Sequence, residues 1–400
     1  MKKGWPEVEI GNAFKTSAGG TPLRSKRQYF DGGTIPWLMS GEVARREIFS
    51  CENFITPLGL QNCSARLLPV DSVLIAMYGA TAGQVGILKF VACTNQAVCA
   101  IHPNDRFIPP FVYYALLAQQ QQLIDSAVGN AQPNLSQIKL RKVRIPAPPL
   151  AEQQRIVGLL DEAFEGLATA KANAEKNLQN TDALFESHLN AVFTKRGPGW
   201  KSTTLGAEID LLAGFAFKSA QYTNDDEGIR LLRGDNIIQG CLRWDDVKRW
   251  PTNDTEEYDR YQLEEGDVVL AMDRPWVKAG LKHATISAND LPCLLVQRTA
   301  RLRGGANLDN RFLKLLIGSA AFTSHILGVQ TGIGVPHISA QQIKDFVFAR
   351  PPVTEQRRLA DNLESLREET QRLARLYERK LAALEELKKS LLDQAFTGEL

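Results

Sequence analysis

The sequence predicts an α+β protein with two mixed α/β domains, separated by a pair of long antiparallel coiled-coil helices, and with a pseudo-two-fold internal repeat. Residues 129–194 align without a gap on residues 332–397, at a constant offset of 203. Each copy ends in a long stretch with helical periodicity and begins with a segment of strand-length apolar runs. Because solenoid repeats are only about 20–50 residues long, a period near 200 residues indicates a duplicated domain.

The first part of each copy reads as a mixed globular domain. Residues 71–77 and 266–272 are matching apolar runs rich in β-branched residues, which favours buried strands. Residues 96–101 and 297–302 are expected to form later strands, and residues 111–127 and 312–327 to form amphipathic helices.

The second part of each copy reads as one long helix. Pro148-Pro149 and Pro351-Pro352 end the preceding strand and open the helix. Apolar or small residues then recur in alternating steps of four and three, which is a heptad seam, and both copies share one discontinuity. The seam positions are 156, 160, 163, 167, 170, 174 and 178 in the first copy, and 359, 363, 366, 370, 373, 377 and 381 in the second.

These boundaries predict four segments, with the two helices packed on each other. They are domain 1 (1–150), a central helix (151–196), domain 2 (197–352) and a C-terminal helix (353–400).

Composition narrows the class of protein. Hydrophobic residues make up 44% of the chain, and no apolar run approaches the roughly 20 residues of a membrane span. Six cysteines without CxxC spacing suggest reduced thiols and a cytoplasmic protein. Residues 1–150 hold 15 basic and 9 acidic residues, a net charge of +6 that suits a polyanion binder. Residues 197–350 hold 18 basic and 19 acidic residues, so a DNA-binding second domain must gather its basic residues on one face.

Motifs of catalysis are missing from the sequence. The small-residue segment 79–83 lacks the lysine of a phosphate-binding loop. The sequence also contains no HExxH motif, no other metal-ligand spacing and no GxSxG elbow. The Asn-Pro-Pro-aromatic tetrapeptide of amino-methyltransferases is absent as well. We therefore expect no catalytic residue and no metal in this chain.

The doubled Pro-Pro-x-x-Glu-Gln element resembles the specificity subunit of type I restriction–modification systems. It spans Pro148-Pro149 to Gln153 in the first copy and Pro351-Pro352 to Gln356 in the second, and the closing Leu391-Leu-Asp-Gln-Ala-Phe-Thr-Gly398 is similar to that family too. The resemblance covers the whole chain, whereas the globular segments match the family only in outline.

The resemblance implies a non-catalytic DNA-recognition subunit. Each domain would be a target recognition domain that reads one half of a split site in double-stranded DNA. The helices would fix the half-site spacing and dock two methyltransferase subunits, and restriction motor subunits would complete the complex. No cofactor is expected in this chain; S-adenosylmethionine would belong to the methyltransferase, and ATP and Mg to the motor nuclease.

Candidate DNA-contacting residues in domain 1 lie in three loops. Arginine and lysine pair with guanine and glutamine with adenine, although each can also hold phosphate. An ordinary solvated turn or hairpin explains the same residues equally well. The candidates are Thr21, Arg24, Lys26, Arg27 and Gln28; Tyr78, Thr81 and Gln84; and Gln132 and Asn134.

In domain 2 the richest loop follows the strand at 266–272, because it combines two cations with an aromatic ring. A loop packed on its own domain is the alternative, and Arg233 in particular can pair with Asp235 instead of DNA. The candidates are Arg274, Trp276 and Lys278, followed by Lys218, Arg230, Arg233, Asn236 and His337.

A second class of function fits the same duplication. A scaffold or adaptor could use the two domains to bind proteins or glycans, with the coiled pair as a strut. Salt-dependent binding to DNA in the presence of methyltransferase subunits separates the two readings.

Overall fold

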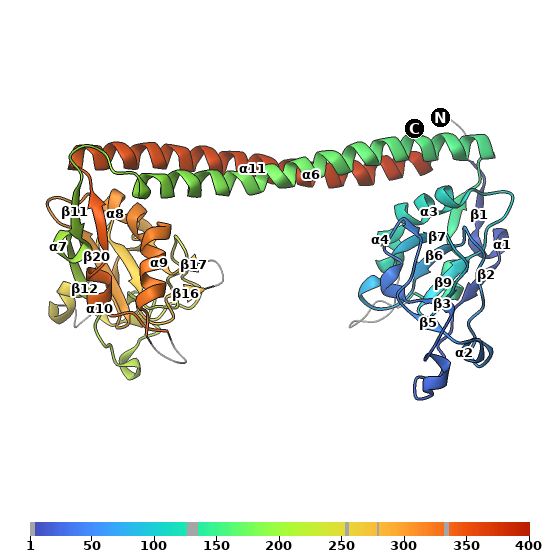
Figure 1. The fold of residues 1–400 in the computed structure, drawn as a ribbon, viewed down its shortest axis with the longest axis horizontal. Helices are drawn as coiled ribbons and strands as arrows, with labels where there is room; N and C mark the ends of the chain where they lie inside the picture. The colour runs from blue at the N-terminus through green and yellow to red at the C-terminus, as the bar shows by residue number, and fades with distance from the viewer. Residues whose placement is uncertain (1–4, 126–134, 253–255, 278–279, 332–335) are drawn as a thin grey trace. The chain divides into compact units, whose positions relative to one another are not determined.

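The computed structural model describes residues 5–125, 135–252, 256–277, 280–331 and 336–400. The chain divides into two compact units (Figure 1). Unit 1 is Met1–Glu175 with Glu378–Leu400, and unit 2 is Lys176–Tyr377. Both combine sheets with helices, which confirms the α+β class.

Unit 1 is built on two mixed sheets. Its larger sheet has the strand order β2-β9-β6-β7-β4 and its smaller one β5-β3-β8. All four residues of the central strand β6 (Val73–Ala76) are buried, since both faces of the sheet are covered. The other strands are β2 (Thr16–Ala18), β9 (Val98–Ile101), β7 (Val85–Leu88), β4 (Glu47–Ile48), β5 (Phe54–Ile55), β3 (Ile35–Leu38) and β8 (Cys93–Thr94).

In its described residues, unit 2 repeats this topology without a strand equivalent to β4, so its larger sheet is wholly antiparallel. Its larger sheet has the order β12-β20-β15-β18 and its smaller one β14-β13-β19. The central strand β15 (Val268–Ala271) is buried throughout, as β6 is. The other strands are β12 (Ile209–Ala213), β20 (Thr299–Gly304), β18 (His283–Thr285), β14 (Arg249–Trp250), β13 (Ile229–Leu232) and β19 (Cys293–Leu295).

The helices that cover these sheets are shorter than the sequence predicts. Residues 111–127 and 312–327 were each expected to form one helix, but each region holds two. In unit 2 the first of these helices ends at Ile317, with Gly318 as its C-cap, and Ser319 caps the next, because its hydroxyl accepts the Phe322 N–H at 3.3 Å. The helices are α3 (Pro109–Ala118) and α4 (Gln120–Asp125) in unit 1, and α8 (Asn310–Ile317) and α9 (Ala320–Val329) in unit 2.

Both units include a segment of each long helix, α6 (Leu150–Thr194) and α11 (Val353–Thr397). In unit 1, Arg155 donates to the Leu400 carbonyl at 2.9 Å while Lys171 reaches Glu385 at 2.6 Å, so the helices run antiparallel. In unit 2, Phe185 and Leu189 pack against Leu363. Every predicted seam position is buried or partly buried, as a coiled-coil seam requires.

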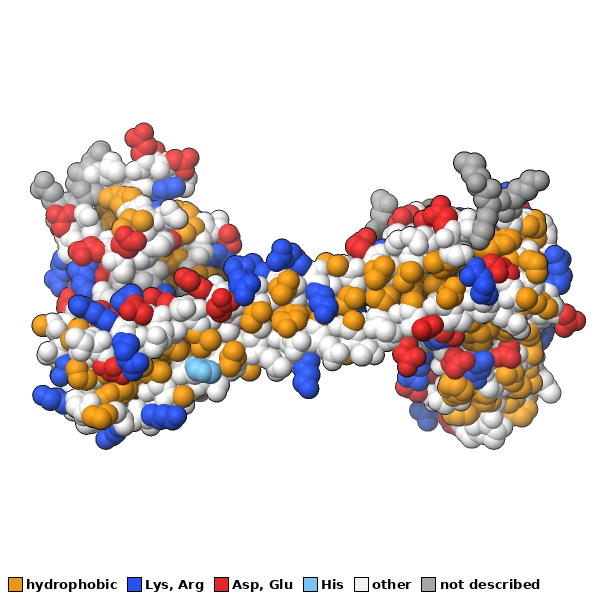
Figure 2. All heavy atoms as spheres, turned by 90° about the horizontal axis from the view of Figure 1, so that it is seen from above, with side chains coloured by type: hydrophobic (Ala, Val, Ile, Leu, Met, Phe, Trp, Pro, Cys, Tyr) orange, Lys and Arg blue, Asp and Glu red, His pale blue; other side chains and the backbone are white. Residues whose placement is uncertain are grey.

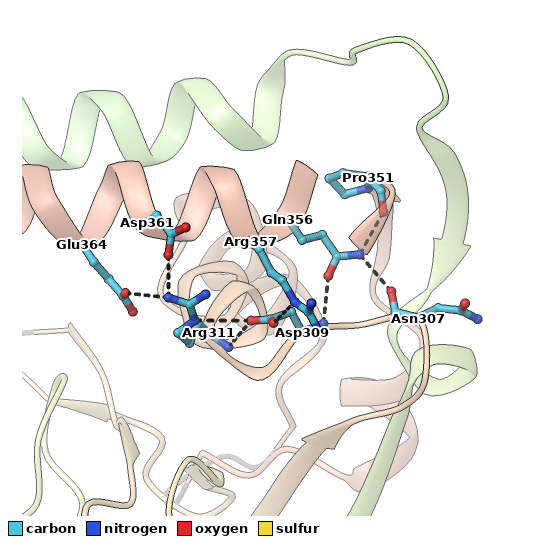
Figure 3. A network of polar contacts seen from close by, with 8 residues as sticks. All are labelled: Asn307, Asp309, Arg311, Pro351, Gln356, Arg357, Asp361 and Glu364. Carbon is cyan, nitrogen blue, oxygen red and sulfur yellow. Dashed lines mark hydrogen bonds and ion pairs between the residues drawn. The ribbon is translucent and has the colours of Figure 1, made fainter. Parts of the chain in front are cut away.

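A buried glutamine fastens each long helix to the domain beside it. Gln356 Oε1 accepts the Asp309 N–H at 2.9 Å, and its Nε2 donates to the carbonyls of Asn307 and Pro351, both at 2.8 Å (Figure 3). Gln153 makes the same three bonds in unit 1, with the Ile108 N–H and the carbonyls of Arg106 and Pro148. Both side chains are 0% exposed, which explains why the Glu-Gln element occurs twice.

Among the described residues no single helix is long and apolar enough to cross a membrane. In the part of the chain that the structure describes, the bent pair α8 and α9, with an angle of 58° between them, reaches the required length and composition together.

Candidate nucleic-acid interface

Polar side chains gather at one edge of the large sheet in unit 2. Asp273 and Arg274 follow the end of β15, Lys282 precedes β18, and Gln297 and Arg298 precede β20. Since β15 runs antiparallel to β18 and β20, these three ends meet at the same edge. Arg233 joins them from the end of β13, where the Val296 N–H bonds to the Leu232 carbonyl at 3.1 Å.

These residues line an open pocket of about 510 Å³. Four of its side chains are basic and two are acidic, so the surface of the pocket has a net positive charge. This pocket brings four basic residues of unit 2 together at one end of the sheet. The lining is Tyr222, Arg233, Gly234, Asp235, Asp273, Arg274, Lys282, Val296, Gln297 and Arg298.

Asp273 organises the exposed side of this pocket. Its carboxylate lies 3.0 Å from the Arg298 guanidinium and also contacts Nδ1 of His337. Arg298 remains 68% exposed, so the carboxylate orients the guanidinium without covering it. Arg274 and Arg298 both have positive φ, of 45° and 65°; Arg274 lies after the end of β15, and Arg298 directly precedes β20.

The remaining candidates in unit 2 differ in solvent exposure and in whether their side chains are bonded to their own domain. Arg274 and Lys218 are exposed, and Trp276 is 41% exposed on β16 (Trp276–Val277). Arg230 is held by its own domain: it donates to the Asn289 and Leu291 carbonyls and lies over the Trp244 ring. Lys278 falls outside the described residues.

Arg233 and Asn236 shape a loop after β13. Arg233 pairs with Asp246 at 2.8 Å rather than with Asp235, the partner considered from the sequence. The two cations Lys248 and Arg233 lower the pKa of the Asp246 carboxyl. Asn236 is 2% exposed, accepting the Arg233 N–H at 3.1 Å and donating to the Arg243 carbonyl at 3.0 Å. Its amide therefore fixes the loop, and contact with DNA remains a prediction.

Unit 1 carries polar residues at the equivalent edge of its sheet. Thr21 follows β2, Tyr78 follows β6, and Gln84 precedes β7. The Thr21 hydroxyl bonds to the side chain of Gln96, which precedes β9 and occupies the place of Gln297. The structure thus brings together two of the three predicted loops, and Gln84 lies partly buried with its Oε1 unpaired.

The basic loop of unit 1 is fully exposed. Arg24, Lys26, Arg27 and Gln28 all lie on the surface, and Lys26 sits 5.5 Å from the centre of the Tyr29 ring. Thr81 bonds to the Tyr78 carbonyl at 3.4 Å within the turn. Gln132 and Asn134 lie outside the described residues.

Sequence reasoning missed Gln297, Arg298 and Lys282. Residues 297–302 were expected to form one strand, whereas β20 begins at Thr299, so the two residues before it lie in the pocket rather than in the sheet. The same shift occurs in the first copy, where residues 96–101 were expected to form the strand but β9 begins at Val98. Lys282 is buried, and loss of solvation lowers the pKa of its ammonium group.

Comparison with known proteins agrees with this architecture. Residues 2–178 match the family model described as the type I restriction modification DNA specificity domain. The chain is 24% identical over 409 residues to the MjaVIII type I restriction enzyme specificity subunit of Methanocaldococcus jannaschii, covering 99% of this chain and 93% of that protein. Residues 2–178 are therefore a type I restriction modification DNA specificity domain, and the chain as a whole is similar to type I specificity subunits.

Other specificity subunits match over different shares of their length. That of the EcoAI enzyme from Escherichia coli is 40% identical over 169 residues, which are 42% of this chain and 28% of the EcoAI subunit. The HsdS subunit of Thermoanaerobacter tengcongensis has a TM-score of 0.67 at 19% identity, over 100% of this chain and 98% of that one. A chain solved in a study of type I R-M complex assembly has a TM-score of 0.78 at 19% identity, over 100% of this chain and 99% of that one.

These structural likenesses show the fold, and together with the family match they identify a DNA specificity subunit rather than a catalytic one. The scaffold alternative is not favoured, because the specificity-subunit relatives extend over both copies of the repeat.

Proposed function

We propose that each unit presents the described edge of its large sheet to one half of a split DNA site. Residues 1–150 and 197–352 act as the two target recognition domains, and residues 151–196 and 353–400 as the helices between them. The observation that carries this proposal is the positively charged pocket of unit 2, where Arg274 and Arg298 remain exposed beside Gln297. Arginine and glutamine are the side chains that pair bidentately with guanine and adenine in the major groove.

The proposed partners follow from the same assignment. Two methyltransferase subunits dock on the helices, and motor subunits add restriction. Leu159 and Leu387 in unit 1 and Leu184 and Leu376 in unit 2 are large apolar side chains exposed on these helices, and Figure 2 shows hydrophobic side chains along the same elements. Exposed apolar area of this kind supports a protein-binding face. S-adenosylmethionine and ATP with Mg would be bound by those partners, in the cytoplasm.

Methylation mapping tests the proposal. The chain is co-expressed with its methyltransferase subunit, and modified adenines are located across the genome. We expect one motif with two specified halves and a fixed unspecified gap. A single continuous motif, or methylation whose sequence preference is unchanged when this chain is exchanged for a relative, would contradict the division of labour.

A further inference from the structure

Unit 2 contains a second cavity, apart from the DNA-facing pocket, where α6, α8 and α11 meet β18. Its volume is about 190 Å³. The polar side chains that line it are Glu186, Gln239, His283, Thr285, Lys314 and Arg367. They come from four different elements and one loop, so the fold rather than a single loop assembles them.

The positive charges in this cavity lack paired carboxylates. In the described part of the chain, neither Lys314 nor Arg367 has a carboxylate oxygen within 4.0 Å. Glu364 is nearby but binds Arg311 at 3.3 Å, and Glu186, exposed on α6, lines the cavity and attracts Arg367 without forming a direct ion pair. Thr285 adds a buried hydroxyl oxygen with no hydrogen-bond partner. The cavity thus holds two cations and a hydroxyl, with Glu186 as its one lining carboxylate among the described residues, and the Arg367 guanidinium lies 4.3 Å from the centre of the Phe185 ring.

The three basic groups disfavour one another's charged forms. Burial, together with the positive charges of Arg367 and Lys314, lowers the pKa of His283 to about 4. Burial also lowers the pKa values of Lys314 and Arg367. The positive charge of Arg367 lowers the pKa of Lys314 as well as that of His283. Buried cations are normally paired, because an uncompensated charge in a low-dielectric site is costly.

The duplicated fold provides an internal comparison on the sheet side of the cavity. His283 pairs with Leu270 of the central strand, and in unit 1 Val85 pairs with the matching Ile75. Two residues further on, Thr285 takes the place of Ile87. Unit 1 therefore fills with buried aliphatic groups the positions where unit 2 has an imidazole and a hydroxyl.

The helix side shows the same exchange. Phe111 and Phe312 are equivalent, since each is fully buried and lies 5.3 Å from the matching phenylalanine of the long helix. Two residues on, Lys314 replaces Tyr113 of unit 1. Arg367 replaces Phe164 at the offset of 203 between the long helices.

In unit 1 the aromatic groups fill this region. Tyr114 lies 5.2 Å from the Tyr113 ring and 5.5 Å from the Phe164 ring. The nearby cation, Arg46, is neutralised by Asp161 at 2.6 Å. Four apolar or aromatic positions of one copy are thus polar or basic in the other, and among the described residues neither Lys314 nor Arg367 makes a direct ion pair of the kind that Arg46 makes with Asp161.

We propose that the cavity of unit 2 binds a small oxyanion, with phosphate as the representative ligand. Lys314 and Arg367 supply the charge and Thr285 donates a hydrogen bond. A volume of about 190 Å³ accommodates one tetrahedral anion with a few waters, each of which occupies about 30 Å³ in the liquid. The proposal does not depend on DNA recognition by the sheet edge.

Equilibrium dialysis of the full chain against radiolabelled inorganic phosphate, at constant ionic strength, tests this site. We expect one phosphate per chain, and at least tenfold weaker binding for Arg367→Phe and Lys314→Tyr, which introduce the residue types of unit 1. Thr285→Val, which conserves shape, keeps the test informative where a larger change unfolds the chain, and should weaken binding about threefold. Lys388→Met is the matched control, because it removes one exposed charge of α11 outside the cavity and should leave binding unchanged.

Competition with duplex DNA identifies the source of the anion. Displacement of the labelled phosphate by DNA, together with weaker DNA binding by Arg367→Phe, assigns the cavity to a backbone phosphate. Retention of phosphate at saturating DNA assigns it to a free anion. The proposal is overturned by wild-type protein that does not bind phosphate, or by equal affinity in the wild type and in Arg367→Phe, Lys314→Tyr and Thr285→Val.

Discussion

Gln356 accepts the backbone N–H of Asp309 at 2.9 Å, and Asp309 is the N-cap residue of α8 (Figure 3). The first turn of a long helix thereby holds the first turn of a domain helix. In unit 1, Gln153 accepts the N–H of Ile108, the N-cap residue of α3, at 3.0 Å. A glutamine side chain suits this position because it satisfies one donor and two carbonyls at once while carrying no charge into a buried site.

Removing this amide should destabilise unit 1. Gln153→Leu keeps a similar size but leaves the Ile108 N–H and two carbonyls unpaired in a buried position. We expect the free energy of unfolding to fall by about 1–3 kcal/mol, measured by urea denaturation.

The next residue along the chain is the control. Gln154 is exposed on the same turn of α6, so Gln154→Leu should change stability by less than about 0.5 kcal/mol. Equal losses for the two variants would show that the hydrogen bonds of Gln153 contribute nothing specific.

Arg274 and Arg298 should contribute to DNA binding. If each contacts a base or a phosphate, replacement by alanine should weaken specific binding by about 1–3 kcal/mol. Fluorescence anisotropy with the complete complex, at several salt concentrations, separates the two roles. Loss of a base contact relaxes specificity at one position of the site, whereas loss of a phosphate contact lowers the salt dependence of binding.

Arg260→Ala removes an exposed cation of unit 2 that does not line the pocket, and serves as the comparison. Full affinity and an unchanged salt slope in both Arg274→Ala and Arg298→Ala would exclude the pocket from the interface.

Acid should destabilise unit 2 through His283. Its pKa is about 4 in the fold, below its ordinary value of 6.5, so the unfolded chain binds more protons between these two values. Stability is therefore complete above pH 6.5 and falls as the pH drops towards 4, by about 2–3 kcal/mol from this group.

Urea denaturation of the wild type and of His283→Val in phosphate-free buffer measures this slope. The variant should lose the dependence between pH 6.5 and 4, whereas His188→Val, at an exposed position of α6, should retain it. An identical pH profile in wild type and His283→Val would refute the assignment.

The long helices should act as a ruler between the two half-sites. Inserting seven residues at matching positions of α6 and α11 preserves the heptad seam and adds about 10 Å to each helix. With 3.4 Å per base pair along the duplex, the gap in the methylated motif should grow by about three base pairs. Mapping that finds the original gap in the lengthened protein would argue against the ruler.

Much of the fold follows from the sequence because duplication samples each pattern twice. The two heptad seams, at positions 156–178 and 359–381, and the buried strands β6 and β15 rest on periodicities that tertiary packing reinforces. The break at Ser319 was missed, since one capping hydroxyl decides it and the apolar pattern continues across it.

The site was harder to predict, because loops carry no periodicity. Thr21 and Tyr78 could be selected as polar loop residues, but their common edge depends on strand order. Arg298 was overlooked for the opposite reason: it stands next to a strand-like run and was assigned to that strand. The partner of Arg233 likewise depends on a loop whose path the sequence does not specify.

The division of the chain into units has a consequence for its synthesis. Unit 1 is discontinuous, and Phe396, close to the last residue, packs 5.3 Å from Phe111 in its core. Unit 2 is continuous, from Lys176 to Tyr377. The domain that leaves the ribosome first therefore has to wait, with part of its interior uncovered, until the second has emerged and the final helix has been translated.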